Sequence, residues 1–327
     1  MRRITLLVVA LGVAAVLTGL AGAASRDTKI ALVAYSTPKE AFSHLIPAFQ
    51  ATPAGQGVSF TQSYGASGDQ ARAIVAGLPA DVVDLSLAPD VDTLVQAGLV
   101  DKSWSKAPYN GIVSDSVIVF VLRNGNPKHI KTWDDLVKPG VQVVTPNPFT
   151  SGGARWNVMA AYGAELREGK TPAQATAYLG KLFHNVVSQD TSARTALQTF
   201  LAGKGDVLLD YENEAILAQR ANQPVFYLIP KATILVENPA AVTKTAPPAA
   251  KAFLAYLRTP AAQLLFGQSG YRPVDPTVRK KFTYPPRPQL FTIKYVGGWD
   301  KVTKQFFDPK SGVMAKIEQS LGVSTGG

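Results

Sequence analysis

Cysteine is absent from this chain of 327 residues, and that absence removes several possibilities. No disulfide can form, so the folded state has to be stabilised by a packed hydrophobic core. A lipid anchor attached to an N-terminal cysteine is excluded as well.

Histidine is almost as scarce, with three copies at His44, His129 and His184. They do not show a metal-binding spacing such as His-Glu-x-x-His, and we expect all three side chains to be exposed. The chain also lacks the phosphate loop G-x-x-x-x-G-K-[ST] and the nucleophile elbow G-x-S-x-G. These gaps argue against a zinc hydrolase, an ATPase and an α/β-hydrolase, and the sequence predicts no metal and no cofactor.

Acidic residues are outnumbered, with 23 Asp and Glu against 33 Lys and Arg, which gives a formal net charge of +10. A positive charge of this size can indicate nucleic acid or an anionic membrane as the partner. Here the basic residues are scattered, with small groups such as 279–281, and aromatic residues do not alternate with them as in single-strand binders. We therefore predict no nucleic-acid partner, and a protein mildly attractive to anions.

Long apolar runs are absent except at the N-terminus. Arg2 and Arg3 precede an almost wholly apolar stretch, 4–20, and small residues at 21–23 offer a cleavage position. The stretch is short and wrongly flanked for a membrane span, so it reads as a cleaved export signal covering 1–24; an uncleaved anchor is the alternative. A soluble exported protein without an anchor suits an enclosed space such as a periplasm.

The most informative segment is 146–157, Pro-Asn-Pro-Phe-Thr-Ser-Gly-Gly-Ala-Arg-Trp-Asn. The apolar run 141–144 before it predicts a buried strand, which the two prolines end. Thr150 or Ser151 can cap a helix, and the two glycines let a ligand approach bare backbone. Amides at a helix N-terminus carry partial positive charge, so the segment predicts a site for a small anion.

The same strand, polar turn and helix recur three more times. The strands 30–35, 58–63 and 186–187 each run into small polar residues and then into apolar residues at helical spacing. In the first repeat, Thr37 and Glu40 predict a capping box, and Pro47 predicts a kink. In open α/β sheets ligands bind outside the carboxyl ends of strands, so four such turns together favour an anion site over ordinary capping.

These motifs resemble those of the periplasmic sulfate-binding proteins that serve ABC importers, over nearly the whole mature chain. The segments that carry the resemblance, beside 146–157, are 63–70, 80–84, 125–128, 133–136, 138–140, 205–208, 212–215 and 297–301. The resemblance implies a non-catalytic receptor and a membrane permease as its partner, and we expect a monomer.

Alternating strands and helices predict an α/β fold. The family resemblance implies two lobes of the type II periplasmic-binding-protein fold, with a hinge between them and the anion in the cleft. We expect lobe one to comprise 25–113 and 224–280, and lobe two 114–223. The apolar runs 117–122 and 224–229 are the candidate crossings between the lobes. The tail 281–327 is expected to pack on the lobes and to end in a helix near 313–321.

The resemblance also implies which residues bind the anion. The hydroxyl of Ser151 and position 211 would donate from side chains, and the other donors would be backbone amides. The predicted set is Ser36, Ser67, Ser151, Gly152, Gly153, Ala193 and Tyr211. Better-known members have tryptophan at position 211, and phenol, unlike indole, can accept as well as donate. We expect Arg155 and Arg194 to support the loops from behind rather than to bind directly.

Three alternatives remain open at this point. The anion could be thiosulfate or another tetrahedral oxyanion, although a site of amides and hydroxyls predicts discrimination against phosphate, whose proton needs an acceptor. Asp90 and Asp92 could bind a cation, but carboxylates that open a helix are commoner. An exported enzyme of the same fold is less favoured, and it would require Glu212 or Asp210 to point into the cleft.

Overall fold

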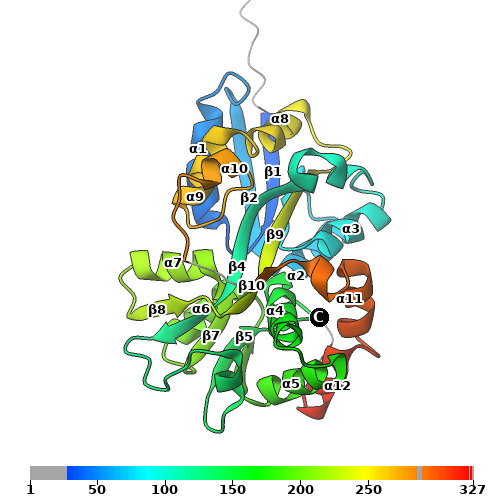
Figure 1. The fold of residues 1–327 in the computed structure, drawn as a ribbon. Helices are drawn as coiled ribbons and strands as arrows, with labels where there is room; N and C mark the ends of the chain where they lie inside the picture. Colours follow the sequence, from blue (N-terminus) through cyan, green and yellow to red (C-terminus); the bar gives the residue numbers. More distant parts are fainter. Residues whose placement is uncertain (1–27, 286–288, 324, 326–327) are drawn as a thin grey trace, which may run out of the picture.

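The chain forms two α/β lobes joined by one continuous sheet (Figure 1). The computed structural model describes residues 28–285, 289–323 and 325, so the predicted signal peptide, 1–24, lies outside the described residues. The strands are hydrogen-bonded in the order β2-β1-β3-β9-β4-β7-β5-β6, with β8 beside β4 and β10 beside β9.

The first lobe holds three parallel strands, β1 (Thr28–Tyr35), β2 (Val58–Gly65) and β3 (Val82–Asp84). The helices pack on this sheet through apolar residues at helical spacing. In the first helix these buried residues are Phe42, Leu45, Ile46 and Phe49. The helices of this lobe are α1 (Lys39–Gln50), α2 (Ser67–Val75), α3 (Ala88–Gln96), α8 (Pro248–Tyr256), α9 (Pro260–Gln268) and α10 (Pro276–Arg279).

Two long antiparallel strands connect the lobes. β4 (Ile112–Arg123) pairs with β9 (Ala232–Val242) through its first half and with β7 and β8 through its second half. β9 also pairs with β3 in the first lobe. The segment 224–229, a candidate crossing in the sequence, contains β8 (Val225–Leu228), which pairs with β4. The strand that follows β8 and pairs both with β3 of the first lobe and with β4 is β9. The lobe boundaries expected from the sequence stay predictions.

The second lobe is built on β7 (Val207–Tyr211), β5 (Val143–Pro146) and β6 (Val186–Asp190), with β5 parallel to both neighbours. β5 ends at Pro146, as the prolines predicted. Its helices are α4 (Gly152–Arg167), α5 (Pro172–His184), α6 (Ala193–Leu201) and α7 (Glu212–Arg220). The carboxyl ends of β5, β6 and β7 meet the helix starts at the side facing the first lobe, where a ligand site is expected.

The C-terminal tail contacts both lobes. β10 (Gln289–Phe291) pairs with β9, α11 (Trp299–Phe306) packs against α3, and α12 (Val313–Ser320) packs against α5. Trp299 stacks edge-on against Trp156 of α4, with ring centroids 4.7 Å apart. The final helix lies where the sequence predicted it. The tail therefore bridges the two lobes at the edge where α11 lies (Figure 1).

One local prediction at the first helix is wrong. Thr37 and Glu40 do not form a capping box, because α1 begins after Pro38 without a side-chain cap. The hydroxyl of Thr37 instead pairs with the hydroxyl of Tyr271 at 3.0 Å, and Glu40 lies 3.8 Å from Arg194. A tertiary partner has taken the hydroxyl that the local pattern assigned to the cap.

Candidate anion-binding site

A small cavity lies where the starts of several helices from both lobes converge. It is a narrow space lined by nine residues, all with uncharged side chains. All seven residues of the predicted set line it, together with two that the sequence did not single out. The lining residues are Tyr35, Ser36, Ser67, Ser86, Ser151, Gly152, Gly153, Ala193 and Tyr211.

Backbone amides reach this cavity because of how the helices begin. Ser67 opens α2, Gly152 and Gly153 open α4, and Ala193 opens α6. The first amides of a helix have no carbonyl partner within the helix, and the helix dipole adds partial positive charge there. The arrangement can therefore stabilise a small anion without a lysine or arginine in direct contact.

The turn before α4 fulfils the prediction made from its sequence. Ser151 is the N-cap, and its Oγ accepts from the amide of Ala154 at 3.4 Å. Accepting that bond leaves the hydroxyl proton of Ser151 available to a ligand. Both glycines lie in close contact with neighbouring side chains, which would have to shift to admit a Cβ. A Cβ at Gly152 would lie 2.6 Å from Ser86 Oγ, and one at Gly153 would lie 3.1 Å from the Tyr211 hydroxyl.

Sequence reasoning missed Tyr35 and Ser86. Tyr35 ends β1 and immediately precedes Ser36. Ser86 follows β3 by two residues and precedes α3, so it occupies the same strand-to-helix position as the predicted residues. Its place at a strand end could have identified it, but it has no neighbouring glycine and no second polar residue to mark the turn.

Tyr211 ends β7, and its side chain is buried. Its hydroxyl lies 2.6 Å from Ser86 Oγ, in the opposite lobe. Its ring meets that of Tyr35 edge-on, with centroids 6.2 Å apart. Burial raises the pKa of Tyr211 well above its ordinary value, with Ser86 opposing the shift, so the phenol keeps its proton.

Arg155 does not line the cavity. Its Nε donates to the carbonyl of Pro148 at 2.9 Å, which braces the turn ahead of α4, and its guanidinium faces the ring of Phe307. Asp90 lies across from it and accepts from the hydroxyl of Ser67 at 2.5 Å. Burial raises the pKa of Asp90, and the charge of Arg155 opposes that shift. Arg155 is thus placed to support the loops from behind.

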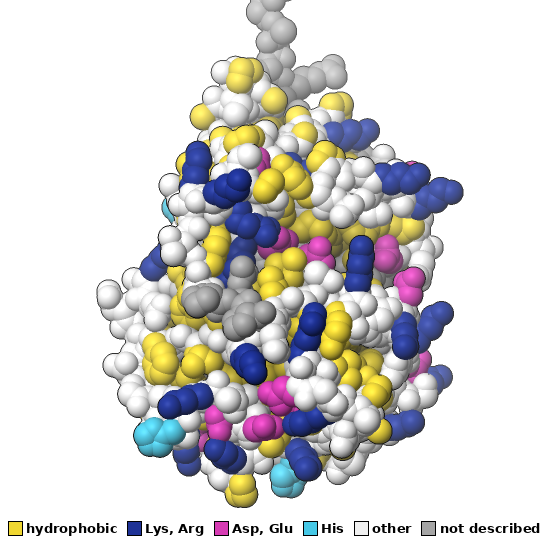
Figure 2. All heavy atoms as spheres, in the orientation of Figure 1, with side chains coloured by type: hydrophobic (Ala, Val, Ile, Leu, Met, Phe, Trp, Pro, Cys, Tyr) yellow, Lys and Arg dark blue, Asp and Glu magenta, His cyan; other side chains and the backbone are white. Residues whose placement is uncertain are grey.

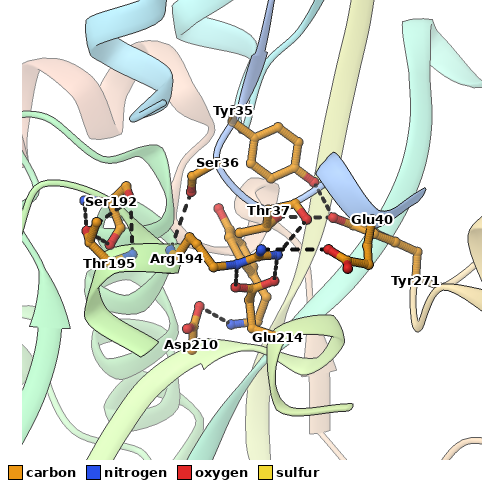
Figure 3. Close-up of polar contacts among 11 residues, drawn as sticks. Tyr35, Ser36, Thr37, Glu40, Ser192, Arg194, Thr195, Asp210, Glu214 and Tyr271 are labelled. Carbon is orange, nitrogen blue, oxygen red and sulfur yellow. Dashed lines mark hydrogen bonds and ion pairs between the residues drawn. The ribbon is translucent and has the colours of Figure 1, made fainter. Parts of the chain in front are cut away.

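Arg194 also lies behind the lining residues, and it contacts both lobes (Figure 3). Its Nε and a terminal nitrogen donate to the buried carboxylate of Glu214 at 2.6 and 2.9 Å. The same terminal nitrogen donates to the carbonyl of Thr37 in the first lobe at 3.1 Å. Its backbone amide donates to Ser36 Oγ at 3.4 Å. The arginine therefore fastens the start of α6 to the turn after β1.

Neither carboxylate that an enzyme would need lines the cavity. Glu212 is buried and receives two hydrogen bonds from Arg272, at 2.5 and 2.7 Å. Asp210 accepts from the amide of Tyr211, and its other oxygen is buried without a partner. Burial, followed by the nearby Glu214, raises the pKa of Asp210 well above its ordinary value. A neutral Asp210 behind the wall of the cavity would not repel a bound anion.

Among the described residues, three features that could indicate a different function do not support one. Asp134, Glu165 and Glu168 have a spacing that could hold a metal, but the ammonium of Lys170 lies 2.7–3.7 Å from all three. The three histidines are exposed, as expected. Lys and Arg side chains are scattered over the face seen in Figure 2 rather than gathered. Within the described residues, no helix combines the length and apolar character needed to cross a bilayer.

Comparisons with known proteins agree on one family. Residues 30–272 match the family model for bacterial extracellular solute-binding proteins. A sulfate-binding protein of Synechococcus elongatus is 41% identical, covering 92% of this chain and 89% of the relative. A thiosulfate-binding protein of Pseudomonas aeruginosa is 36% identical, covering 88% and 92%. The structure of the sulfate-binding protein SubI from Mycobacterium tuberculosis superposes with a TM-score of 0.83 at 45% identity, covering 86% of this chain and all of the other. The chain therefore belongs to the bacterial extracellular solute-binding proteins.

Proposed function

We propose that this protein is a non-catalytic receptor that binds one sulfate between its lobes and delivers it to the permease of an ABC importer. It would act in the periplasm as a monomer, after removal of residues 1–24. Amides of Ser36, Ser67, Gly152, Gly153 and Ala193 and the hydroxyls of Ser151 and Tyr211 would hold the anion. Arg155 and Arg194 would act through the loops that they brace.

The observation that carries the proposal is the chemistry of the cavity lining. Its potential donors are backbone amides and hydroxyls, and the nine lining side chains include no carboxylate to repel a dianion. Hydrogen bonds to a charged group contribute ~1.5–3 kcal/mol each, so several neutral donors can together hold a desolvated dianion.

Relatives support sulfate first and thiosulfate second. Proteins named as sulfate-binding, from Escherichia coli among others, reach 39–41% identity, and two named as thiosulfate-binding reach 36%. Thiosulfate is also a tetrahedral dianion and makes the same demand for donors. The enzyme alternative is not favoured, because Glu212 is engaged by Arg272 and Asp210 lies behind the wall.

Calorimetric titration of the purified mature protein with sulfate, thiosulfate and molybdate tests the proposal. We expect one sulfate per chain with micromolar or tighter affinity, equivalent to ~8 kcal/mol or more. Solution scattering should show a smaller radius of gyration with sulfate, because closing the lobes around the ion compacts the molecule. No heat of binding and no compaction at millimolar sulfate would disprove it.

A further inference from the structure

The indole of Trp156 reaches from the second lobe to the first. Trp156 lies in α4, one turn after the two glycines that line the cavity, and its side chain is fully buried. Its Nε1 donates to the backbone carbonyl of Ser86, between β3 and α3 of the first lobe, at 2.9 Å. This hydrogen bond therefore joins a helix of one lobe to a turn of the other.

Both partners of this bond are held in place by further contacts. The amide of Ser86 donates to Ser67 Oγ at 2.9 Å, and the carbonyl of Ser86 also accepts from Asn238 Nδ2 of β9 at 3.0 Å. The ring of Trp156 meets that of Trp299 in α11 edge-on, with centroids 4.7 Å apart. An indole fixed in this way loses little rotamer freedom when it bonds across the lobes.

Trp156 is connected to the cavity through Ser86 and not through direct contact with a ligand. Ser86 lines the cavity, whereas Trp156 is not among the nine residues that line it. The hydroxyl of Tyr211, also in the second lobe, lies 2.6 Å from Ser86 Oγ. The second lobe thus reaches the backbone of Ser86 through Trp156 and its hydroxyl through Tyr211. Trp156 therefore acts on a bound anion by holding the lobes together around it.

Separating the lobes affects the two partners of the bond differently. The carbonyl of Ser86 keeps Asn238 as a donor, because that part of β9 stays with the first lobe, where the carbonyl of Pro239 accepts from the amide of Leu85 at 3.0 Å. The indole N–H of Trp156 loses its partner and has to be hydrated. The bond therefore favours the closed arrangement, by about fivefold for one hydrogen bond of ordinary strength.

We propose that Trp156 is a positioning residue that holds the lobes closed through Ser86 and thereby sets how long sulfate stays bound. This role presupposes the proposed function, a receptor that closes around sulfate. Because the bond forms only when the lobes are together, its loss speeds the opening that releases the anion. The first encounter of sulfate with the open protein does not involve the bond. The effect of Trp156 therefore lies in the dissociation rate, where most affinity differences between related complexes lie.

Two variants and one matched control test this role. Trp156→Phe keeps an aromatic ring against Trp299 but removes the N–H, and Trp299→Leu keeps the N–H but removes the ring that packs on the indole. Trp133→Phe is the control. Trp133 is also buried, and its Nε1 donates to the carbonyl of Ala232 at 2.9 Å. Its ring meets that of Phe120 edge-on where β4 pairs with β7, within the second lobe.

Calorimetry gives the sulfate affinity of each protein, and release of radiolabelled sulfate into excess unlabelled sulfate gives the dissociation rate. We expect Trp156→Phe to weaken binding about fivefold and to release sulfate faster by the same factor. The association rate should stay within about twofold of the parent value. Trp299→Leu should change affinity and release in the same direction by a smaller factor. Trp133→Phe should leave both unchanged, although it too loses a buried hydrogen bond.

Sulfate release at the parental rate in Trp156→Phe would overturn this inference and leave the sulfate receptor intact. An equal change in Trp133→Phe would also overturn it, because the effect would then be a general weakening of the fold. If Trp156→Phe does not fold, Trp299→Leu decides, and parental release in that variant would count against the role of Trp156. A parent that binds no sulfate would instead overturn the proposed function itself, so the two failures are distinguishable.

Discussion

The guanidinium of Arg194 donates two hydrogen bonds to the carboxylate of Glu214, at 2.6 and 2.9 Å. Burial alone would lower the pKa of Arg194, but the bond to Glu214 outweighs it and holds that pKa above its ordinary value. With its charge satisfied inside the second lobe, the arginine can extend its terminal nitrogen to the carbonyl of Thr37 in the first lobe. The ion pair therefore pre-positions a contact that exists only when the lobes are together.

Replacing Arg194 with lysine should weaken sulfate binding by ~1–2 kcal/mol, about tenfold. The ammonium of lysine cannot reproduce the planar guanidinium that bonds both Glu214 and Thr37, so the closed arrangement loses a contact. Part of the binding free energy of sulfate is then used to close the lobes, which lowers the observed affinity. Calorimetry measures the loss. Arg123→Lys is the matched control, because its guanidinium bonds the carbonyls of Lys204 and Gly205 within the second lobe. Equal affinities for Arg194→Lys and the parent would contradict the role in closure.

Replacing Ser151 with alanine should reduce sulfate affinity about ten- to a hundredfold, the loss of one donor to a buried charge at ~1.5–3 kcal/mol. The same change removes an N-cap and should lower the free energy of unfolding by ~1 kcal/mol. Thr171→Ala separates the two effects, because Thr171 caps α5 in the same way but does not line the cavity. Both variants should lose stability in urea unfolding, and Ser151→Ala alone should lose affinity. An undiminished affinity in Ser151→Ala would mean that its hydroxyl does not bind the anion.

The ion pair of Glu212 and Arg272, with both side chains 1% exposed, should be costly to break from one side. Glu212→Gln leaves the Arg272 cation buried without its partner, so we expect the free energy of unfolding to fall by ~3–5 kcal/mol. The double change Glu212→Leu with Arg272→Met should recover most of that loss. Asp69→Asn, at the exposed pair with Arg72, should change stability by ~1 kcal/mol or less. A double variant no more stable than Glu212→Gln would contradict this account.

Stability should depend on pH through Asp115. Burial raises the pKa of Asp115 to about 7, against the attraction of Arg279. A carboxyl with a raised folded-state pKa stabilises the fold below its unfolded pKa and loses that contribution as pH rises to the folded value. Asp115→Asn removes this dependence. The unfolding free energy of the variant minus that of the parent should therefore rise between about pH 4 and pH 7 and stay constant above pH 7.

Urea unfolding across that pH range measures the effect. Asp101→Asn is the control, because hydrogen bonds from Ser103 lower the pKa of the exposed Asp101. Its contribution is present above the unfolded pKa, so the difference from the parent should stay flat between about pH 5 and pH 8. A flat difference for Asp115→Asn over the same range would show that its carboxyl does not titrate there.

Local sequence signals predicted much of the fold near the site. The prolines and glycines of 146–157 correctly indicated the end of β5 and the start of α4, because proline and capping preferences act within a few residues. The predicted lining residues all come from strand ends and helix starts, and they meet around one cavity. Their contact with an anion stays a prediction.

Tertiary structure decided what these local signals could not. The hydroxyl of Thr37 pairs with Tyr271, more than 200 residues away, and not with its own helix. Ser86 joins the cavity because the second lobe brings Tyr211 to within 2.6 Å of it, and no pattern around Ser86 reports that approach. A sequence states what each residue can donate or accept over a few neighbours. Which distant group becomes the hydrogen-bond partner is determined only by the pairing of the strands and by the contact between the lobes.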